Sequence, residues 1–359
     1  MNTDSALEPA VLVERRGRLG LLTLNRPRTI NALSHEMVQL ISAALEGWRD
    51  NPAIATVAIV GSGDRGLCAG GDVLFLYRDA KENGARGSAA FWADEYRMNL
   101  AISRYPKPVV AIQDGIVLGG GVGVSAHGSH RVVTERTRIG FPETTIGFVP
   151  DVGATWLLSR APGNLGIRLA LSSESVGAAD AILIGLSDAH IPSAHIPRLV
   201  SALETEDAAT TIALLASEPE PGVLAAQQSW TDAAFAASTV PEILDLLRAS
   251  RQPDAETLAH TITGKSPIAV TVALEAVRRA RALPDLGSAL VEEYRVSRHA
   301  ASSHDFVEGI RAQLVDKDRT PQWHPRRFAD IDASAVSAYF AAPPEGDLDL
   351  NAPSLEERS

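Results

Sequence analysis

The chain has 359 residues, of which 45% are hydrophobic and 21% are charged, and this ordinary globular composition excludes wholesale disorder. Its net charge of −11 argues against nucleic-acid binding, and its single cysteine excludes an intramolecular disulfide or a cysteine-rich metal site. The N-terminal residues do not follow the order of a secretory signal, and the most apolar stretch, 109–126, is interrupted by Gln113 and Asp114. We therefore expect a cytoplasmic protein without a membrane segment.

Short apolar runs alternate with a helical pattern in the first part of the chain. Strands are predicted at 19–25, 55–61, 108–115 and 130–141. Residues 34–48 carry apolar side chains at helical spacing, with Ser34 as a suitable N-cap. A further helix is predicted to begin near Asp151. The alternation of strands and helices, with nearly continuous apolar strands, predicts an α/β fold.

After about residue 195 the strand signals disappear, and alanine-rich amphipathic stretches replace them. Helices are predicted at 196–204, 208–216, 240–250, 268–282 and 286–301. The last stretch is polar, acidic and marked by prolines. We predict an α/β core over 10–200, a helical C-terminal region over 201–340 and a flexible acidic tail over 341–359.

Two glycine-rich turns follow predicted strands, one at 67–72 and the other at 118–121. Glycine lets other backbone approach closely, and the start of a helix presents free N–H groups. Two such N–H donors that converge on one carbonyl oxygen would form an oxyanion hole. The alternative is that each turn only packs a helix on a sheet. The spacings of a phosphate loop, a zinc protease and a complete dinucleotide loop are all absent from the sequence.

Two carboxylates, Glu143 and Asp151, lie in an apolar segment that contains no basic residue from 139 to 159. A partly buried carboxylate has a raised pKa and suits a general base, and a second one can orient water or transfer a proton. Asp151 is also suitably placed to be the N-cap of the helix that follows it. Both roles stay open for Asp151 at this stage.

Several segments resemble the enoyl-CoA hydratase/isomerase (crotonase) superfamily. They are LNRPRTINAL at 24–33, GLCAGGD at 66–72, LGGGVG at 118–123 and FPETTIGFVPDVG at 141–153. Others are similar to its hydrolase branch: DEYRMNL at 94–100, KSP at 265–267 and DFVEGIRAQLVDKD at 305–318. The resemblance covers about residues 10 to 325. It implies the crotonase (ClpP-like) fold of repeated ββα units, followed by a C-terminal helical region.

The resemblance also implies roles for individual residues. The backbone N–H groups of Gly71 and Gly120 would hold a thioester carbonyl. Glu143 matches the glutamate that hydratases and the hydrolase branch share. Glu95 matches a glutamate that the hydrolase branch uses near its substrate. The resemblance assigns the turn at 67–72 only backbone donors, so Cys68 is expected to pack rather than to react.

The choice of reaction depends on two further positions. Gly123 stands where hydratases carry a second glutamate, and Asp151 stands where the hydrolase branch carries aspartate and typical hydratases carry glycine. Hydration of an enoyl thioester needs two carboxylates on one water, so the glycine favours hydrolysis. We expect Glu143 to act as nucleophile or general base, and Asp151 to position water or the substrate hydroxyl.

The expected substrate is a short β-hydroxyacyl-CoA, with 3-hydroxyisobutyryl-CoA of valine breakdown as the first candidate. The alternatives are an enoyl-CoA hydratase or isomerase, and a non-catalytic subunit that binds acyl-CoA.

The expected partner is the acyl-CoA substrate, with no nucleic acid, no membrane, no metal and no cofactor besides the coenzyme A of the substrate. Arg26 and Arg28 are candidates for binding the coenzyme A phosphates, and the alternative is an ordinary solvated turn with two arginines. A homo-oligomer is expected because the superfamily commonly forms trimers and pairs of trimers.

Overall fold

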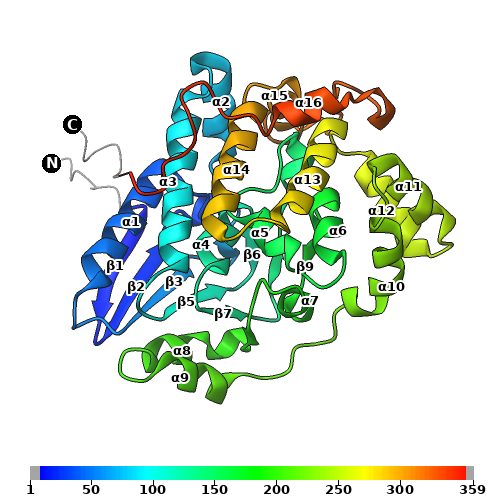
Figure 1. Ribbon diagram of the computed structural model, residues 1–359. Helices are drawn as coiled ribbons and strands as arrows, with labels where there is room; N and C mark the ends of the chain where they lie inside the picture. The colour runs from blue at the N-terminus through cyan, green and yellow to red at the C-terminus, as the bar shows by residue number, and fades with distance from the viewer. Residues whose placement is uncertain (1–8, 353–359) are drawn as a thin grey trace.

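The computed structural model describes residues 9–352 and contains two β-sheets (Figure 1). The six-stranded sheet has the order β1 (Val11–Arg16), β2 (Leu19–Leu24), β3 (Thr56–Gly61), β5 (Val109–Gln113), β7 (His130–Val133) and β10 (Ala189–His190). The four-stranded sheet has the order β4 (Gly66–Cys68), β6 (Ile116–Leu118), β8 (Arg138–Gly140) and β9 (Ser175–Val176). The pairs β1–β2 and β8–β9 are antiparallel, and the other neighbours are parallel. The predicted α/β class is confirmed.

The chain alternates between the two sheets, which produces the repeated ββα unit. Strands β3, β5 and β7 of the large sheet lead directly to β4, β6 and β8 of the small one. The predicted single strand over 130–141 is therefore wrong. A turn closed by hydrogen bonds between Thr134 and Thr137 divides it into β7 and β8, and these strands join different sheets.

Helices follow the strand pairs in the first half of the chain. They are α1 (His35–Arg49), α2 (Val73–Asn83), α3 (Arg86–Ser103), α4 (Gly120–Ala126), α5 (Ala154–Ser159), α6 (Leu165–Ser172) and α7 (Ala178–Leu183). Helix α1 is confirmed, and the Ser34 hydroxyl accepts a hydrogen bond from the Met37 N–H. The prediction that Asp151 caps α5 is wrong. Val152 (φ 58°) and Gly153 (φ 82°) turn the chain before the helix begins, so Gly153 occupies the N-cap position.

The second half is helical, as predicted. It contains α8 (Ile196–Ala202), α9 (Ala208–Leu215), α10 (Leu224–Phe235), α11 (Val240–Ala249), α12 (Pro253–Thr263), α13 (Pro267–Ala280), α14 (Leu286–Ala300), α15 (His304–Ile310) and α16 (Ala333–Ala338). Short turns of other helix types are η1 (Pro27–Thr29), η2 (Glu143–Ile146), η3 (Ser193–His195), η4 (Arg311–Val315) and η5 (Phe328–Asp330). Helices α8 and α9 cover one face of the large sheet, whereas α13 and α14 lie beside α5 and α3 (Figure 1). The helical region thus packs directly on the α/β part.

The segment after residue 340 lies along α14. Leu348 is buried, and the Asp347 carboxylate pairs with the Arg295 guanidinium at 2.6 Å. Residues 353–359, which belong to the predicted flexible tail, lie outside the described residues. The predicted boundaries at 200 and 340 stay predictions. Within residues 9–352, no helix is both long and apolar enough to cross a bilayer.

Candidate active site

A small cavity of about 70 Å³ lies where the beginnings of α2 and α4 meet α3, η2 and α15. Its lining includes five of the seven residues that the sequence nominated for the site: Gly71, Glu95, Gly120, Glu143 and Asp151. Gly71, Gly120 and Glu143 each follow a strand of the small sheet, in which β4, β6 and β8 are neighbours, and this order brings them to one place.

The two glycine turns lie against each other at one side of the cavity. A Cβ atom built on Gly120 would lie 3.3 Å from the backbone nitrogen of Gly71. Gly120 is the first residue of α4, so its N–H has no acceptor within the helix. The same Cβ would lie 2.7 Å from Oε1 of Glu95, a distance that real Cβ atoms do not show. A side chain at position 120 would force Glu95 or the Gly71 turn to shift, whereas glycine lets the two turns present their N–H groups to one carbonyl oxygen.

Three buried carboxyl groups surround the rest of the cavity. Glu95 comes from α3, Glu143 begins η2, and Asp151 follows η2. Among residues 9–352, the buried side-chain polar atoms without a hydrogen-bond partner are Oε1 of Glu95, Oε2 of Glu143 and both amide atoms of Asn99. Unpaired buried polar atoms are rare in folded proteins because they are costly. The two on Glu95 and Glu143 belong to residues that line the cavity, as expected where a polar ligand group is to be bound.

Burial dominates the electrostatics of these groups. It raises the pKa of Glu95 and of Glu143 well above the usual value, and the nearby charge of Asp151 raises both further. Burial also raises the pKa of Asp151 to about 7, against the opposing effect of a 2.7 Å hydrogen bond from the Tyr96 hydroxyl. Carboxyl groups with such pKa values can exchange protons near neutral pH.

The two arginines nominated for phosphate binding do not line this cavity. Arg26 donates to Oδ2 of Asp72 at 3.0 Å and to the carbonyl of Ala32 at 2.6 Å, so its guanidinium supports the Gly71 turn. The Arg28 residue is exposed. Cys68 is fully buried, and burial raises its thiol pKa to about 12, which makes it unsuitable as a nucleophile.

The sequence interpretation missed the residues that support the site from a distance. The Tyr96 hydroxyl also bonds Oγ of Ser297 on α14 at 2.8 Å. One wall of the cavity is formed by Trp92, Phe148 and Phe306, whose rings pack together with centroid distances of 5.3 to 6.4 Å. Tyr96 and Phe306 lie in motifs that the sequence singled out, but neither motif indicates what those side chains contact.

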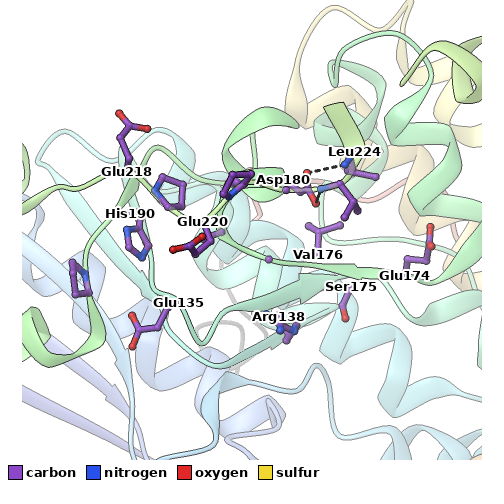
Figure 2. A pocket seen from close by; sticks show the side chains of 18 of the residues that line it. Glu135, Arg138, Glu174, Ser175, Val176, Asp180, His190, Glu218, Glu220 and Leu224 are labelled. Atoms are coloured by element: carbon purple, nitrogen blue, oxygen red, sulfur yellow. Dashed lines mark hydrogen bonds between the residues drawn. The ribbon is translucent and has the colours of Figure 1, made fainter. Parts of the chain in front are cut away.

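A larger cavity of about 600 Å³ lies elsewhere, between β9, α7 and the loop before α10 (Figure 2). Two of its acidic side chains, Asp180 and Glu174, already have structural partners. Asp180 accepts from the N–H groups of Val223 and Leu224, both at 3.0 Å, and Glu174 pairs with Arg168. These two carboxylates hold the fold together, so this cavity is a weaker candidate for the catalytic site than the small one. Within the described part of the chain, no cluster of three or more His, Cys, Asp or Glu residues could hold a metal.

The family assignment comes from comparison with known proteins. A family model described as "Enoyl-CoA hydratase/isomerase" matches residues 19–340. The chain belongs to this family.

Its relatives within the enoyl-CoA hydratase/isomerase family carry different names. The chain is 35% identical to 3-hydroxyisobutyryl-CoA hydrolase 1 of Arabidopsis thaliana, over 95% of this chain and 93% of the relative. It is 36% identical to the mitochondrial 3-hydroxyisobutyryl-CoA hydrolase of Rattus norvegicus, over 94% and 90%. Among solved structures, a carnitinyl-CoA dehydratase from Mycobacterium thermoresistibile is 47% identical, with a TM-score of 0.93 over 96% of this chain and 99% of that one. The crotonase fold is confirmed. The names of these relatives describe two different reactions, hydrolysis and dehydration, so the geometry of the site has to distinguish between them.

Proposed function

We propose that this chain hydrolyses a short β-hydroxyacyl-CoA thioester, 3-hydroxyisobutyryl-CoA, to the free hydroxy acid and coenzyme A, as a step of valine breakdown. The hydrolases that it resembles match nearly its whole length. The small cavity with its aromatic wall suits a short acyl group better than a long chain. No cofactor is needed, because coenzyme A is part of the substrate.

In the proposed reaction the thioester carbonyl oxygen accepts hydrogen bonds from the N–H groups of Gly71 and Gly120, which stabilise the negative charge of the tetrahedral intermediate. Glu143 either attacks the carbonyl carbon and forms a mixed anhydride, which water then hydrolyses to the free hydroxy acid and Glu143, or it removes a proton from the water that attacks the thioester. In both routes the C–S bond breaks and coenzyme A leaves as the thiolate. Asp151 holds the water or the β-hydroxyl group, and Glu95 contacts the substrate beside Gly120.

The observation that carries this proposal is the crowding around Gly123. A Cβ atom built there would lie 2.6 Å from Cβ of Val152 and 2.7 Å from Nδ2 of Asn99. The family resemblance places the second hydratase glutamate at this position, and the surroundings leave no room for it. Glu143 and Asp151 are present instead, and Oε1 of Glu143 lies against the start of α4, 2.6 Å from a Cβ built on Gly119. This position is next to the proposed oxyanion donor Gly120 and suits attack on a carbonyl held there.

Dehydration is the second candidate, because the dehydratase from Mycobacterium thermoresistibile is 47% identical to this chain. It would use Glu143 to remove a proton from the α-carbon and a neighbouring carboxyl group to protonate the leaving hydroxyl.

The cellular location and the oligomeric state of this chain stay proposals as well. The rat relative is named a mitochondrial enzyme, and the cytoplasmic location and homo-oligomer expected for this chain are untested.

The proposed reaction is tested by comparing two products. We expect free thiol to appear from 3-hydroxyisobutyryl-CoA, detected with a thiol reagent, and no change in enoyl absorbance with crotonyl-CoA. Formation of an enoyl product from a β-hydroxyacyl-CoA without thiol release would establish dehydration instead. Release of thiol from none of a set of short β-hydroxyacyl-CoA esters would exclude the hydrolase.

A Tyr96→Phe substitution is expected to move the pH dependence of hydrolysis. The Tyr96 hydroxyl stabilises the ionised form of Asp151, whose pKa is about 7, so its loss raises that pKa. The acidic limb of the kcat–pH profile should move upward by about one to two units, since a hydrogen bond to a charged group contributes about 1.5–3 kcal/mol. Tyr105→Phe is the matched control, because the Tyr105 hydroxyl donates to the carbonyl of Leu45, and this pair is not part of the cavity lining. An unmoved limb in Tyr96→Phe would show that Asp151 does not set the profile.

A further inference from the structure

A buried carboxyl group on α14, in the C-terminal half of the chain, contacts the turn that follows Asp151. Oε2 of Glu293 accepts a hydrogen bond from the Gly153 N–H at 2.6 Å. Oε1 accepts from the N–H of Thr155 at 2.8 Å and from its hydroxyl at 2.6 Å. These donors belong to the first turn of α5, immediately after Asp151. The glutamate is 2% exposed, and the reaction proposed above does not use it.

This turn has a backbone conformation that needs such support. Val152 lies at φ 58°, in the left-handed region that a β-branched residue adopts only under strain. Its carbonyl accepts a hydrogen bond from Nε2 of His127 at 2.8 Å, and burial lowers the pKa of His127 to about 4, so the ring is neutral at physiological pH. The strained peptide is thus held on both sides, at the Val152 carbonyl by His127 and at the next N–H by Glu293.

Helix α14 reaches Asp151 by a second route as well. Ser297 lies one helical turn after Glu293, and its hydroxyl contacts that of Tyr96, which donates to Asp151. Glu293 therefore holds the backbone of the Asp151 turn, and Ser297 supports the hydrogen bond to the Asp151 side chain. The two contacts come from the same face of one helix.

We propose that Glu293 is a positioning residue for the hydrolysis: by holding the strained Val152–Gly153 turn, it keeps the Asp151 carboxylate directed at the cavity, beside Glu143. The inference rests on the proposed function. Helix α14 would then contribute to catalysis as well as packing against the core.

The kinetic test compares Glu293→Ala, Glu293→Gln and the matched control Glu292→Gln. Glu292 neighbours Glu293 on α14 and pairs with Arg279 instead. We expect Glu293→Ala to lower kcat per folded enzyme by about 100-fold, with KM changed less than threefold. Glu293→Gln should recover part of that loss, because its one oxygen can still serve Thr155 while its NH₂ group opposes the Gly153 N–H. Glu292→Gln should keep wild-type kcat and KM.

Circular dichroism at the assay temperature measures the folded fraction, so loss of folding is separated from loss of positioning. If Glu293 only stabilised the fold, folded Glu293→Ala would keep the wild-type kcat, and the proposal would be wrong. A crystal structure of Glu293→Ala tests the positioning role without any measurement of activity. We expect Val152 to relax to negative φ and Asp151 to leave the Tyr96 hydroxyl. An unchanged turn would overturn the inference, whereas absence of thiol release in the wild-type enzyme would overturn only the proposed function.

Discussion

Replacing Glu143 with glutamine is expected to lower thiol release by about 10³- to 10⁴-fold, because an amide can neither attack the carbonyl nor accept a proton from water. The same change should stabilise the fold at neutral pH. Burial and Asp151 hold the pKa of Glu143 well above its usual value, so the unfolded chain ionises this group more readily than the folded one. The free energy of unfolding therefore falls as the pH rises above about 4.3, the pKa of this group in the unfolded chain. Glutamine does not ionise, so the substitution removes this loss of stability.

The measurement combines the thiol assay with thermal unfolding. We expect the Tm of Glu143→Gln to exceed that of the wild type by a few degrees at pH 7.5, for a gain of about 1–2 kcal/mol, and the difference to shrink toward pH 5. Glu46→Gln is the control, because the Glu46 side chain is 76% exposed and pairs only with Arg49 on α1. Activity of Glu143→Gln within tenfold of wild type would contradict the catalytic role. A Tm gain independent of pH would contradict the electrostatic explanation.

Gly120→Ala is expected to lower kcat/KM by about 10²- to 10³-fold, as the loss of one oxyanion-hole donor does. The added methyl group would lie 2.7 Å from Oε1 of Glu95 and 3.3 Å from the Gly71 nitrogen, where the carbonyl oxygen is expected to bind. The methyl group either occupies the space meant for the carbonyl oxygen or pushes the turn away, and both outcomes weaken the hydrogen bonds to that oxygen.

The matched control for this prediction is Gly47→Ala. Gly47 lies within α1, and a Cβ built there meets nothing within 4 Å. Alanine is favoured over glycine inside a helix by about 0.5–1 kcal/mol, so this variant should keep full activity and unfold at a slightly higher temperature. If Gly120→Ala kept kcat/KM within fivefold of wild type, the two glycine turns would not form the oxyanion hole.

Local patterns were sufficient for much of the fold. Helices α1, α13 and α14 follow from apolar spacing, and β2, β3 and β5 follow from apolar runs that end in turn residues. The error at 130–141 arose because β7 and β8 are both apolar, and the turn between them carries threonine and charged residues in place of glycine or proline. Helices α10 and α12 were not predicted, although their buried positions follow a helical period.

The sequence by itself nominated the groups that the proposed reaction uses. Glu143, Asp151 and the two glycine turns lie in short motifs, where residue type and spacing already restrict the backbone. The tertiary structure alone decided how these groups are held. Glu293 lies 138 residues after Thr155, and Phe306 lies far along the chain from Trp92, so no local pattern relates them. Their pairing depends on how α14 and α15 pack against α3 and α5. That packing also buries the carboxyl groups and thereby raises their pKa values.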